Sequence, residues 1–181
     1  MLLRAETSAL LVVDFQERLM PAIHQADQTV AHAVWLIQIA QQLRIPVLAS
    51  EQYPRGLGPT VAAIRNVLPA EAFMEKNHFS CAAEQDCMRR IDNCGRVQWI
   101  LVGVESHVCV LQTALELQAT GKEVYLVADA VSSRSPRDVE LAMDRMRSEG
   151  VRIVSREMVV FEWLHQAGTD SFRAISREFL R

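Results

Sequence analysis

The sequence alternates short apolar runs with longer amphipathic segments. Apolar runs bounded by polar or turn residues predict strands over residues 9–13, 45–49, 72–74, 97–102, 124–128 and 151–154. Several of these runs are apolar at nearly every position, which is typical of strands that are covered on both faces. Such strands usually belong to parallel sheets, because the connecting helices pack on the two faces.

Helical periodicity occupies the intervals between the runs. Apolar residues spaced by three and four predict helices over residues 28–44, 83–93, 107–120 and 136–149. Ser135 and Pro136 form an N-cap and a first-turn proline for the last of these helices, and Gly150 follows its end. The tail, 156–181, is also expected to be helical and to dock on the body or on a neighbouring subunit. This alternation predicts an α/β fold with a mainly parallel sheet between two helical layers.

Composition narrows the class of protein. A chain of 181 residues is expected to form a single domain, 1–181. The net charge of −3 and a pI near 6.0 give no basic footprint for nucleic acid. No apolar run is long enough to cross a membrane, and Glu6 interrupts the N-terminal run too early for a signal peptide. We therefore expect a cytoplasmic protein whose four cysteines are free thiols.

Three predicted strands end at or near residues whose side chains could take part in catalysis. Asp14 follows the first predicted strand, Lys76 the third and Cys109 the fourth, and in a parallel sheet these ends meet at one edge. Cys109 is expected in the first turn of a helix, where the helix dipole favours a thiolate. Lys76 is one of only two lysines beside 17 arginines, and a lysine offers a compact charge with a shiftable pKa. Together they would provide an acid/base, an electrostatic stabiliser and a nucleophile.

Each residue also has a structural interpretation when taken singly. An aspartate after a strand is commonly a turn former, a lysine there is commonly solvated, and a cysteine on an apolar helix is commonly core. Three further cysteines, Cys81, Cys87 and Cys94, are interpreted as buried or incidental thiols, since their spacing does not match a zinc site. The chain has no glycine-rich dinucleotide motif, P-loop or serine nucleophile elbow.

Three motifs taken together resemble those of a known superfamily. They are Leu11-Val-Val-Asp14-Phe-Gln16, the segment Glu75-Lys76-Asn-His-Phe-Ser80, and Gly103-Val-Glu-Ser-His-Val-Cys109-Val110. In this order they resemble the isochorismatase-like cysteine hydrolases, which include nicotinamidases, N-carbamoylsarcosine amidohydrolase and isochorismatases. The resemblance covers essentially the whole chain. It implies a three-layer, Rossmann-like α/β/α sandwich with a six-stranded parallel sheet, assembled as a homo-dimer or tetramer.

The resemblance also implies a role for each motif residue. Asp14 would act as general base, Lys76 would keep Asp14 ionised and favour the thiolate, and Cys109 would attack a carbonyl to form a thioester. The Val104–Glu105 peptide bond would be cis, and the backbone N–H groups of Glu105 and Cys109 would form an oxyanion hole. The substrate is expected to be a small molecule. Its pocket is expected to be lined by Phe15, Gln16, Gln52, Phe79 and His107.

Differences from the motifs of individual superfamily members restrict the reactions that we expect of this chain. Nicotinamidases carry an Asp-x-His metal motif after the second strand, but this chain has Ser50-Glu-Gln-Tyr-Pro-Arg55 there, so neither a metal nor another cofactor is expected. Isochorismatases have a non-nucleophilic residue where this chain has Cys109. Residues 51–59 instead resemble a subgroup known as isochorismatase domain-containing proteins.

Three hypotheses about function remain open on the sequence. The leading one is a cysteine hydrolase that cleaves a small amide or related C–N bond. The second is an enzyme that hydrolyses an isochorismate-like vinyl ether with Asp14 and without Cys109. The third is a catalytically idle oligomeric scaffold.

Overall fold

The computed structural model of the protein describes residues 1–180. Within this part of the chain a six-stranded sheet has the strand order β3-β2-β1-β4-β5-β6, and every neighbouring pair is parallel. The strands are β1 (Ser8–Val13), β2 (Val47–Gln52), β3 (Phe73–Lys76), β4 (Gln98–Val104), β5 (Glu123–Ser132) and β6 (Arg152–Val154). The predicted parallel α/β architecture is confirmed.

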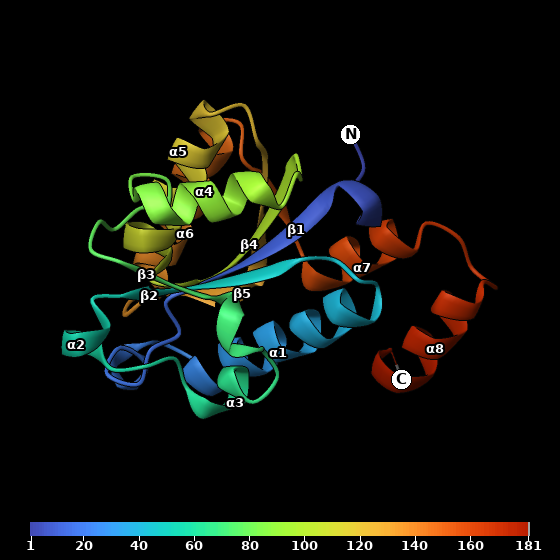
Figure 1. Ribbon diagram of the computed structural model, residues 1–181, viewed down its shortest axis with the longest axis horizontal. Coiled ribbons are helices and arrows are strands. Elements are labelled where there is room, and N and C mark those ends of the chain that lie inside the picture. The colour runs from blue at the N-terminus through green and yellow to red at the C-terminus, as the bar shows by residue number, and fades with distance from the viewer. Residues whose placement is uncertain (181) are drawn as a thin grey trace.

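Helices cover both faces of this sheet (Figure 1). They are α1 (Ala26–Gln42), α2 (Pro54–Leu57), α3 (Ala62–Arg65), α4 (Gln85–Asn93), α5 (Leu111–Ala119), α6 (Pro136–Ser148), α7 (Arg156–Leu164) and α8 (Asp170–Phe179). The apolar core on one face includes residues of α1, α3, α7 and α8, and the core on the other includes residues of α4, α5 and α6. The N-cap predicted for α6 is confirmed, since the Ser135 hydroxyl accepts a hydrogen bond from the N–H of Arg137.

Strand β1 lies at the centre of the sheet and is buried along its whole length. Its alternate side chains enter opposite cores: Leu10 and Val12 pack on the side of α1, whereas Leu11 and Val13 pack on the side of α4 and α5. Residues that follow β1 therefore emerge at the middle of the carboxyl edge, flanked by the ends of β2 and β4.

Several element boundaries differ from the predicted ones. Strand β2 continues through Ser50, Glu51 and Gln52, and β3 continues to Lys76, because the two strands stay in register up to the pair Gln52–Lys76. The pattern missed these residues since they are polar, and the hydrogen-bonded ladder does not depend on hydrophobicity. The predicted helix 107–120 is divided into a π-helical turn, Ser106–Val110, and α5.

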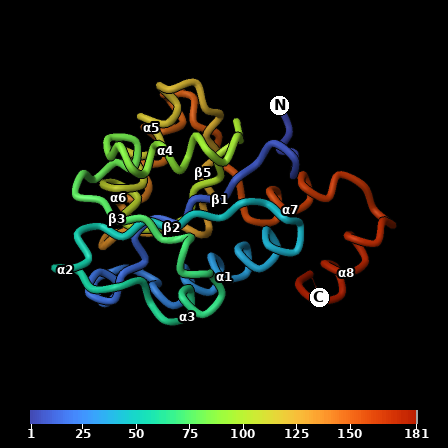
Figure 2. The backbone as a smooth tube through the Cα atoms, in the orientation of Figure 1, coloured from blue at the N-terminus to red at the C-terminus, as the bar shows by residue number. Residues whose placement is uncertain are grey.

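The C-terminal tail is helical, as expected, and it packs against the same chain. In Figure 2 α8 lies beyond the end of α1, at the opposite side of the molecule from α2. The Trp35 indole N–H on α1 donates to the Phe179 carbonyl at 3.1 Å, and the Gln42 amide donates to the Glu178 carboxylate at 2.7 Å. These contacts fix the tail to the layer that contains α1.

Gly103 allows β4 to lie close beside β1 near the carboxyl edge. Its φ of +142° is rare for residues with a side chain, and a Cβ built there would lie 2.3 Å from the Val13 carbonyl oxygen. Backbone atoms cannot move aside as the end of a flexible side chain can. A glycine is therefore required where the chain passes from β4 toward Cys109.

We expect Gly103→Ala to lower the free energy of unfolding by about 3 kcal/mol or more, because strain in φ is combined with a clash against backbone. Urea denaturation followed by circular dichroism measures the change. Gly121→Ala is the matched control: its φ is +89° and a Cβ there has no neighbour within 4 Å, so only conformational strain of about 1 kcal/mol is expected. Equal losses in the two variants would contradict the close-contact argument.

Candidate active site

Asp14 and Lys76 form a buried ion pair at the carboxyl edge of the sheet. Lys76 Nζ lies 2.8 Å from Asp14 Oδ2, and neither side chain has solvent exposure. The other carboxylate oxygen of Asp14 accepts a hydrogen bond of 2.6 Å from the hydroxyl of Ser50 in β2. Asp14 has a left-handed backbone (φ 53°), a conformation that aspartate adopts more readily than most residues. Both carboxylate oxygens thus have donors, as a buried anion requires.

The ammonium group of Lys76 is surrounded by oxygen acceptors. Besides Asp14 it donates to Gln52 Oε1 at 2.6 Å and to the Phe79 carbonyl at 2.8 Å, and the His78 carbonyl lies farther away at 3.3 Å. Burial has the largest single effect and would lower the pKa of Lys76. The charge of Asp14 and its hydrogen bond, together with the neighbouring Cys109 and Cys81, outweigh burial, so this pKa lies above its usual value of 10.5. The lysine is therefore charged throughout the physiological pH range.

Cys109 completes the cluster from the turn that follows β4. Its sulfur lies 3.9 Å from Gln52 Oε1, and the residue is only 5% exposed. The Val104–Glu105 peptide bond is cis, as the resemblance implies. The Glu105 carbonyl then accepts from the N–H groups of Val108 and Val110, which closes the π-helical turn around it. The structure thus brings Cys109 into the same buried pocket as the ion pair.

The resting state of Cys109 differs from the expectation. Burial raises the pKa of the Cys109 thiol above its ordinary value, and the negative charge of Asp14 raises it further, whereas Lys76 lowers it. The expected effect of a helix N-terminus is therefore outweighed by desolvation. Cys109 also lies in the π-helical turn and not in the first turn of α5. At neutral pH the group is a thiol that needs a base to become a nucleophile.

The residues expected to line the pocket have different environments. Gln52 contacts both Lys76 and Cys109. Gln16 is fully buried, and its side-chain amide binds the backbone of Gln52. Phe15 is 1% exposed and belongs to the apolar core on the side of α1, away from the side of Cys109.

The remaining two expected pocket residues lie nearer the surface. The Phe79 side chain is half exposed, and only its carbonyl contacts Lys76. The His107 ring is hydrogen-bonded to the Ser133 hydroxyl at 3.0 Å. Neither side chain contacts the ion pair through a hydrogen bond within residues 1–180.

Sequence reasoning missed two neighbours of the ion pair. Ser50 was not singled out, although the register that pairs it with Val13 places it beside Asp14. Cys81 was predicted to be a buried or incidental thiol; it is buried, but its closeness to Asp14, Lys76 and Ser50 was not foreseen. Burial raises its pKa to about 11, so it is a neutral thiol that packs against the site. An apolar neighbourhood of this kind isolates the ion pair from water.

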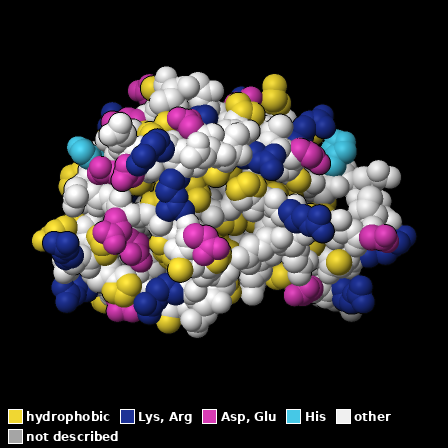
Figure 3. Space-filling view, in the orientation of Figure 1, with side chains coloured by type: hydrophobic (Ala, Val, Ile, Leu, Met, Phe, Trp, Pro, Cys, Tyr) yellow, Lys and Arg dark blue, Asp and Glu magenta, His cyan; other side chains and the backbone are white. Residues whose placement is uncertain are grey.

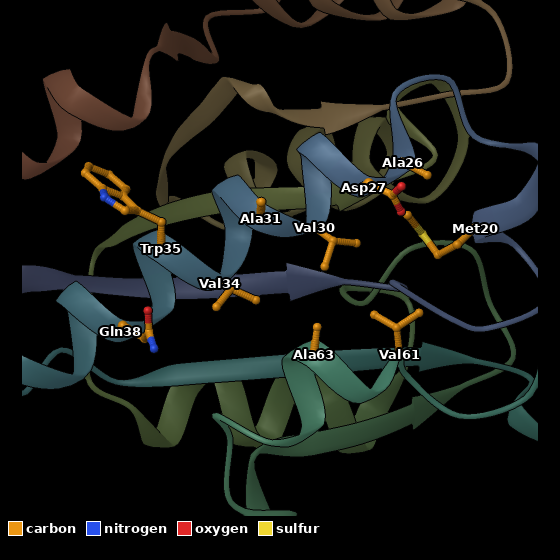
Figure 4. Close-up of a pocket in the computed structure, with 10 residues that line it drawn as sticks. All are labelled: Met20, Ala26, Asp27, Val30, Ala31, Val34, Trp35, Gln38, Val61 and Ala63. Atoms are coloured by element: carbon orange, nitrogen blue, oxygen red, sulfur yellow. The ribbon is translucent and has the colours of Figure 1, made fainter. Parts of the chain in front are cut away.

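A large groove of the described chain lies away from this site. It has a volume of about 550 Å³ and runs between α1 and α3, on the opposite side of the sheet from Cys109 (Figure 4). Its walls are mainly apolar, from residues such as Val30, Val34 and Trp35, and it contains none of the residues expected in the site. This groove is therefore separate from the candidate active site.

Residues 1–180 contain no group of three or more histidine, cysteine, aspartate or glutamate side chains placed to hold a metal ion. In the same part of the chain no helix is long and apolar enough to span a membrane.

The fold and this site define a class of α/β proteins that hold a lysine–aspartate pair beside a cysteine at the carboxyl edge of a parallel sheet. The family model described as "Isochorismatase domain" matches residues 8–158. The chain belongs to the isochorismatase family.

Individual relatives support this assignment over nearly the whole length. "Isochorismatase domain-containing protein 2" of Danio rerio is 37% identical over 179 residues, which cover 97% of this chain and 88% of the relative. A structure described as MAR1 ribonuclease from Caenorhabditis elegans is 31% identical, with a TM-score of 0.92 and coverage of 100% and 93%. The YcaC gene product of Escherichia coli, described as an octameric hydrolase of unknown specificity, is 22% identical with a TM-score of 0.92 and coverage of 99% and 91%, and it shows the fold alone.

The two lysines of the chain provide a matched test of the buried pair. We expect Lys76→Met to lower the free energy of unfolding by about 3–5 kcal/mol, because it leaves the Asp14 carboxylate buried without its partner. Lys122→Met removes a lysine that pairs at 2.9 Å with Asp92, an exposed carboxylate, so a loss below about 1 kcal/mol is expected. Urea denaturation near neutral pH compares the variants. A small loss in both would mean that Asp14 is not held as a buried anion.

Proposed function

We propose that this protein is a hydrolase that cleaves a small amide or related C–N bond through a thioester on Cys109. The observation that carries the proposal is the desolvated Lys76–Asp14 ion pair facing a buried thiol. A solvent-excluded lysine and aspartate contribute little to stability compared with apolar residues of the same size. They do provide a permanent charge and a base beside a potential nucleophile.

The proposed reaction has two steps. In the first, Asp14 takes the proton of the Cys109 thiol as the sulfur attacks the carbonyl carbon, and the C–N bond breaks as Asp14 returns this proton to the leaving nitrogen. In the second, Asp14 takes a proton from water, the hydroxide attacks the thioester, and the C–S bond breaks to release the acid and the thiolate. Asp14 then returns the proton to the sulfur. Lys76 stays charged throughout and stabilises each anionic form.

The backbone N–H groups of Glu105 and Cys109 are proposed as the oxyanion hole. Glu105 directly precedes the turn Ser106–Val110, which its carbonyl closes, and Cys109 lies within this turn. Preorganised backbone donors stabilise the negative charge on the substrate oxygen, and losing one typically costs on the order of 3–4 kcal/mol of barrier. Gln52, His107 and the half-exposed Phe79 are proposed to contact the rest of the substrate. The residue exposure of 5% at Cys109 favours a small substrate.

Two other functions predict different results. An isochorismate-type vinyl-ether hydrolase would use Asp14 and keep its activity in Cys109→Ala. An idle scaffold would show no acyl transfer in any form. The name ribonuclease belongs to the C. elegans relative, and a net charge of −3 does not favour RNA as a substrate of this chain. On the face shown in Figure 3 acidic and basic side chains are intermixed, without a single basic patch.

The cellular compartment and the oligomeric state are also part of the proposal. The free cysteines suit a reducing compartment such as the cytoplasm. A homo-oligomer, dimer or tetramer, is proposed from the family, of which E. coli YcaC is described as octameric. No metal or other cofactor enters the proposed steps.

Acetyl transfer from 4-nitrophenyl acetate tests the covalent step. We expect the wild type to release nitrophenolate and to carry an acetyl group on Cys109, located by mass spectrometry after rapid acid quenching. Cys109→Ala is expected to lose both signals. Asp14→Asn is expected to lower turnover at least about 100-fold, because the general base is lost.

Cys94→Ala is the matched control, since it removes a partly buried thiol outside the site. It is expected to retain wild-type turnover and the acetyl group on Cys109. Turnover that survives in Cys109→Ala would rule out the thioester mechanism. Isochorismate hydrolysis that survives in Cys109→Ala but not in Asp14→Asn would support the vinyl-ether function instead.

A further inference from the structure

Gln52 lies between two groups that the proposed mechanism uses. Its Oε1 atom is 2.6 Å from Lys76 Nζ and 3.9 Å from Cys109 Sγ, the latter a long contact suited to an S–H donor. The residue is 7% exposed. A single carbonyl oxygen therefore contacts both the ammonium group and the thiol.

Chemistry fixes the orientation of the Gln52 amide. Its Nε2 group donates to the Asn77 carbonyl at 2.8 Å. With the amide reversed, an N–H would face the Lys76 ammonium and two carbonyl oxygens would face each other, so both contacts would become repulsive. The oxygen must lie on the side of Lys76 and Cys109.

The proton count at Lys76 explains what this oxygen does. An ammonium group has three protons, and three short acceptors surround it: Asp14 Oδ2 at 2.8 Å, Gln52 Oε1 at 2.6 Å and the Phe79 carbonyl at 2.8 Å. A hydrogen bond from Lys76 to the Cys109 sulfur, which lowers the pKa of the thiol, must therefore compete with these acceptors for a proton. Without the Gln52 oxygen one N–H would be free to turn toward the sulfur.

Gln16 holds Gln52 in this place. The Gln16 Oε1 atom accepts from the Gln52 backbone N–H at 2.7 Å, and its Nε2 group donates to the Gln52 carbonyl at 2.9 Å. Gln16 is itself fully buried and also donates to the Gly58 carbonyl at 2.8 Å. This two-point contact fixes the backbone from which the Gln52 side chain extends.

We infer that Gln52 is a positioning residue that keeps resting Cys109 protonated, because its amide oxygen accepts the S–H group and takes the Lys76 proton that would otherwise stabilise a thiolate. The inference rests on the proposed function. It means that the nucleophile forms only when Asp14 removes the thiol proton during attack. A resting thiol is also less exposed to oxidation and alkylation than a thiolate.

Substitution of Gln52 leaves the other ionisable groups around the thiol in place. Asp14 follows β1, and Lys76 ends β3. The segment after β3 contributes His78, Cys81 and Glu84. The turn that contains Cys109 contributes His107 and is preceded by Glu105, which pairs with Arg134, and α6 contributes Asp138. A change in the reactivity of Cys109 can therefore be assigned to the group at position 52.

Two variants of nearly the same size test the inference in opposite directions. Gln52→Met removes the oxygen, so alkylation of Cys109 by iodoacetamide at about pH 8 is expected to become at least about tenfold faster, equivalent to one unit in pKa. Gln52→Glu adds a negative charge, so alkylation is expected to become at least about tenfold slower. Quantitative mass spectrometry of the Cys109 peptide gives both rates. Altered access to the thiol would change the two variants in the same direction.

A second measurement separates positioning from folding. Hydrolysis of 4-nitrophenyl acetate by Gln52→Met is expected to fall at least about tenfold even though its thiol reacts faster, because Lys76 loses one of the contacts that direct it. If Gln52→Met does not fold, Gln52→Asn replaces it: the shorter amide withdraws its oxygen and is expected to speed alkylation. Rates equal to wild type, or shifted alike in the neutral and acidic variants, would overturn the inference. Wild type that forms no acetyl group on Cys109 would instead overturn the proposed function, whatever the alkylation rates.

Discussion

The site depends on one interaction, the ion pair between Lys76 and Asp14 in the interior of the protein. Two charges removed from water are stable only if their remaining hydrogen-bonding capacity is satisfied. The chain meets this requirement with the Ser50 hydroxyl on one side and with the Gln52 amide and the Phe79 carbonyl on the other. Much of the carboxyl edge of β2 and β3 is therefore organised around a pair of opposite charges.

Burial and the same ion pair together set the state of the thiol. Burial raises the pKa of Cys109 most, Asp14 raises it further and Lys76 lowers it, so this pKa lies above its ordinary value. A base next to a neutral thiol differs from a preformed thiolate, because deprotonation and attack are then coupled. The amide of Gln52 adds to this arrangement by occupying a lysine proton. In the proposed mechanism, the reactivity of Cys109 is thus controlled by a small number of buried hydrogen bonds.

The fold was largely predictable because its signals are local. Alternation of apolar runs with helical periodicity identified the parallel sheet. Asp14, Lys76 and Cys109 were expected to lie close together because the carboxyl ends of parallel strands share one edge of the sheet. The extensions of β2 and β3 into polar residues were not predictable in this way. Residues from Ser50 to Gln52 are strand because their neighbours continue the hydrogen-bonded ladder, and this information is not contained in the segment itself.

Residue types and their order along the chain were thus enough to indicate the architecture and to predict that Asp14, Lys76 and Cys109 come together at the carboxyl edge of the sheet. Distances, burial and partners depended on packing between segments far apart in the sequence. The helix-dipole argument predicted an acidic thiol, whereas the folded chain places Cys109 in a desolvated pocket beside a carboxylate, and desolvation has the larger effect. Likewise, Gln52 was one of several candidate wall residues until the contacts of Gln16, Lys76 and Asn77 fixed the direction of its amide. Electrostatic roles of this kind follow from three-dimensional proximity, because the strength of each interaction depends on distance and on exclusion of water.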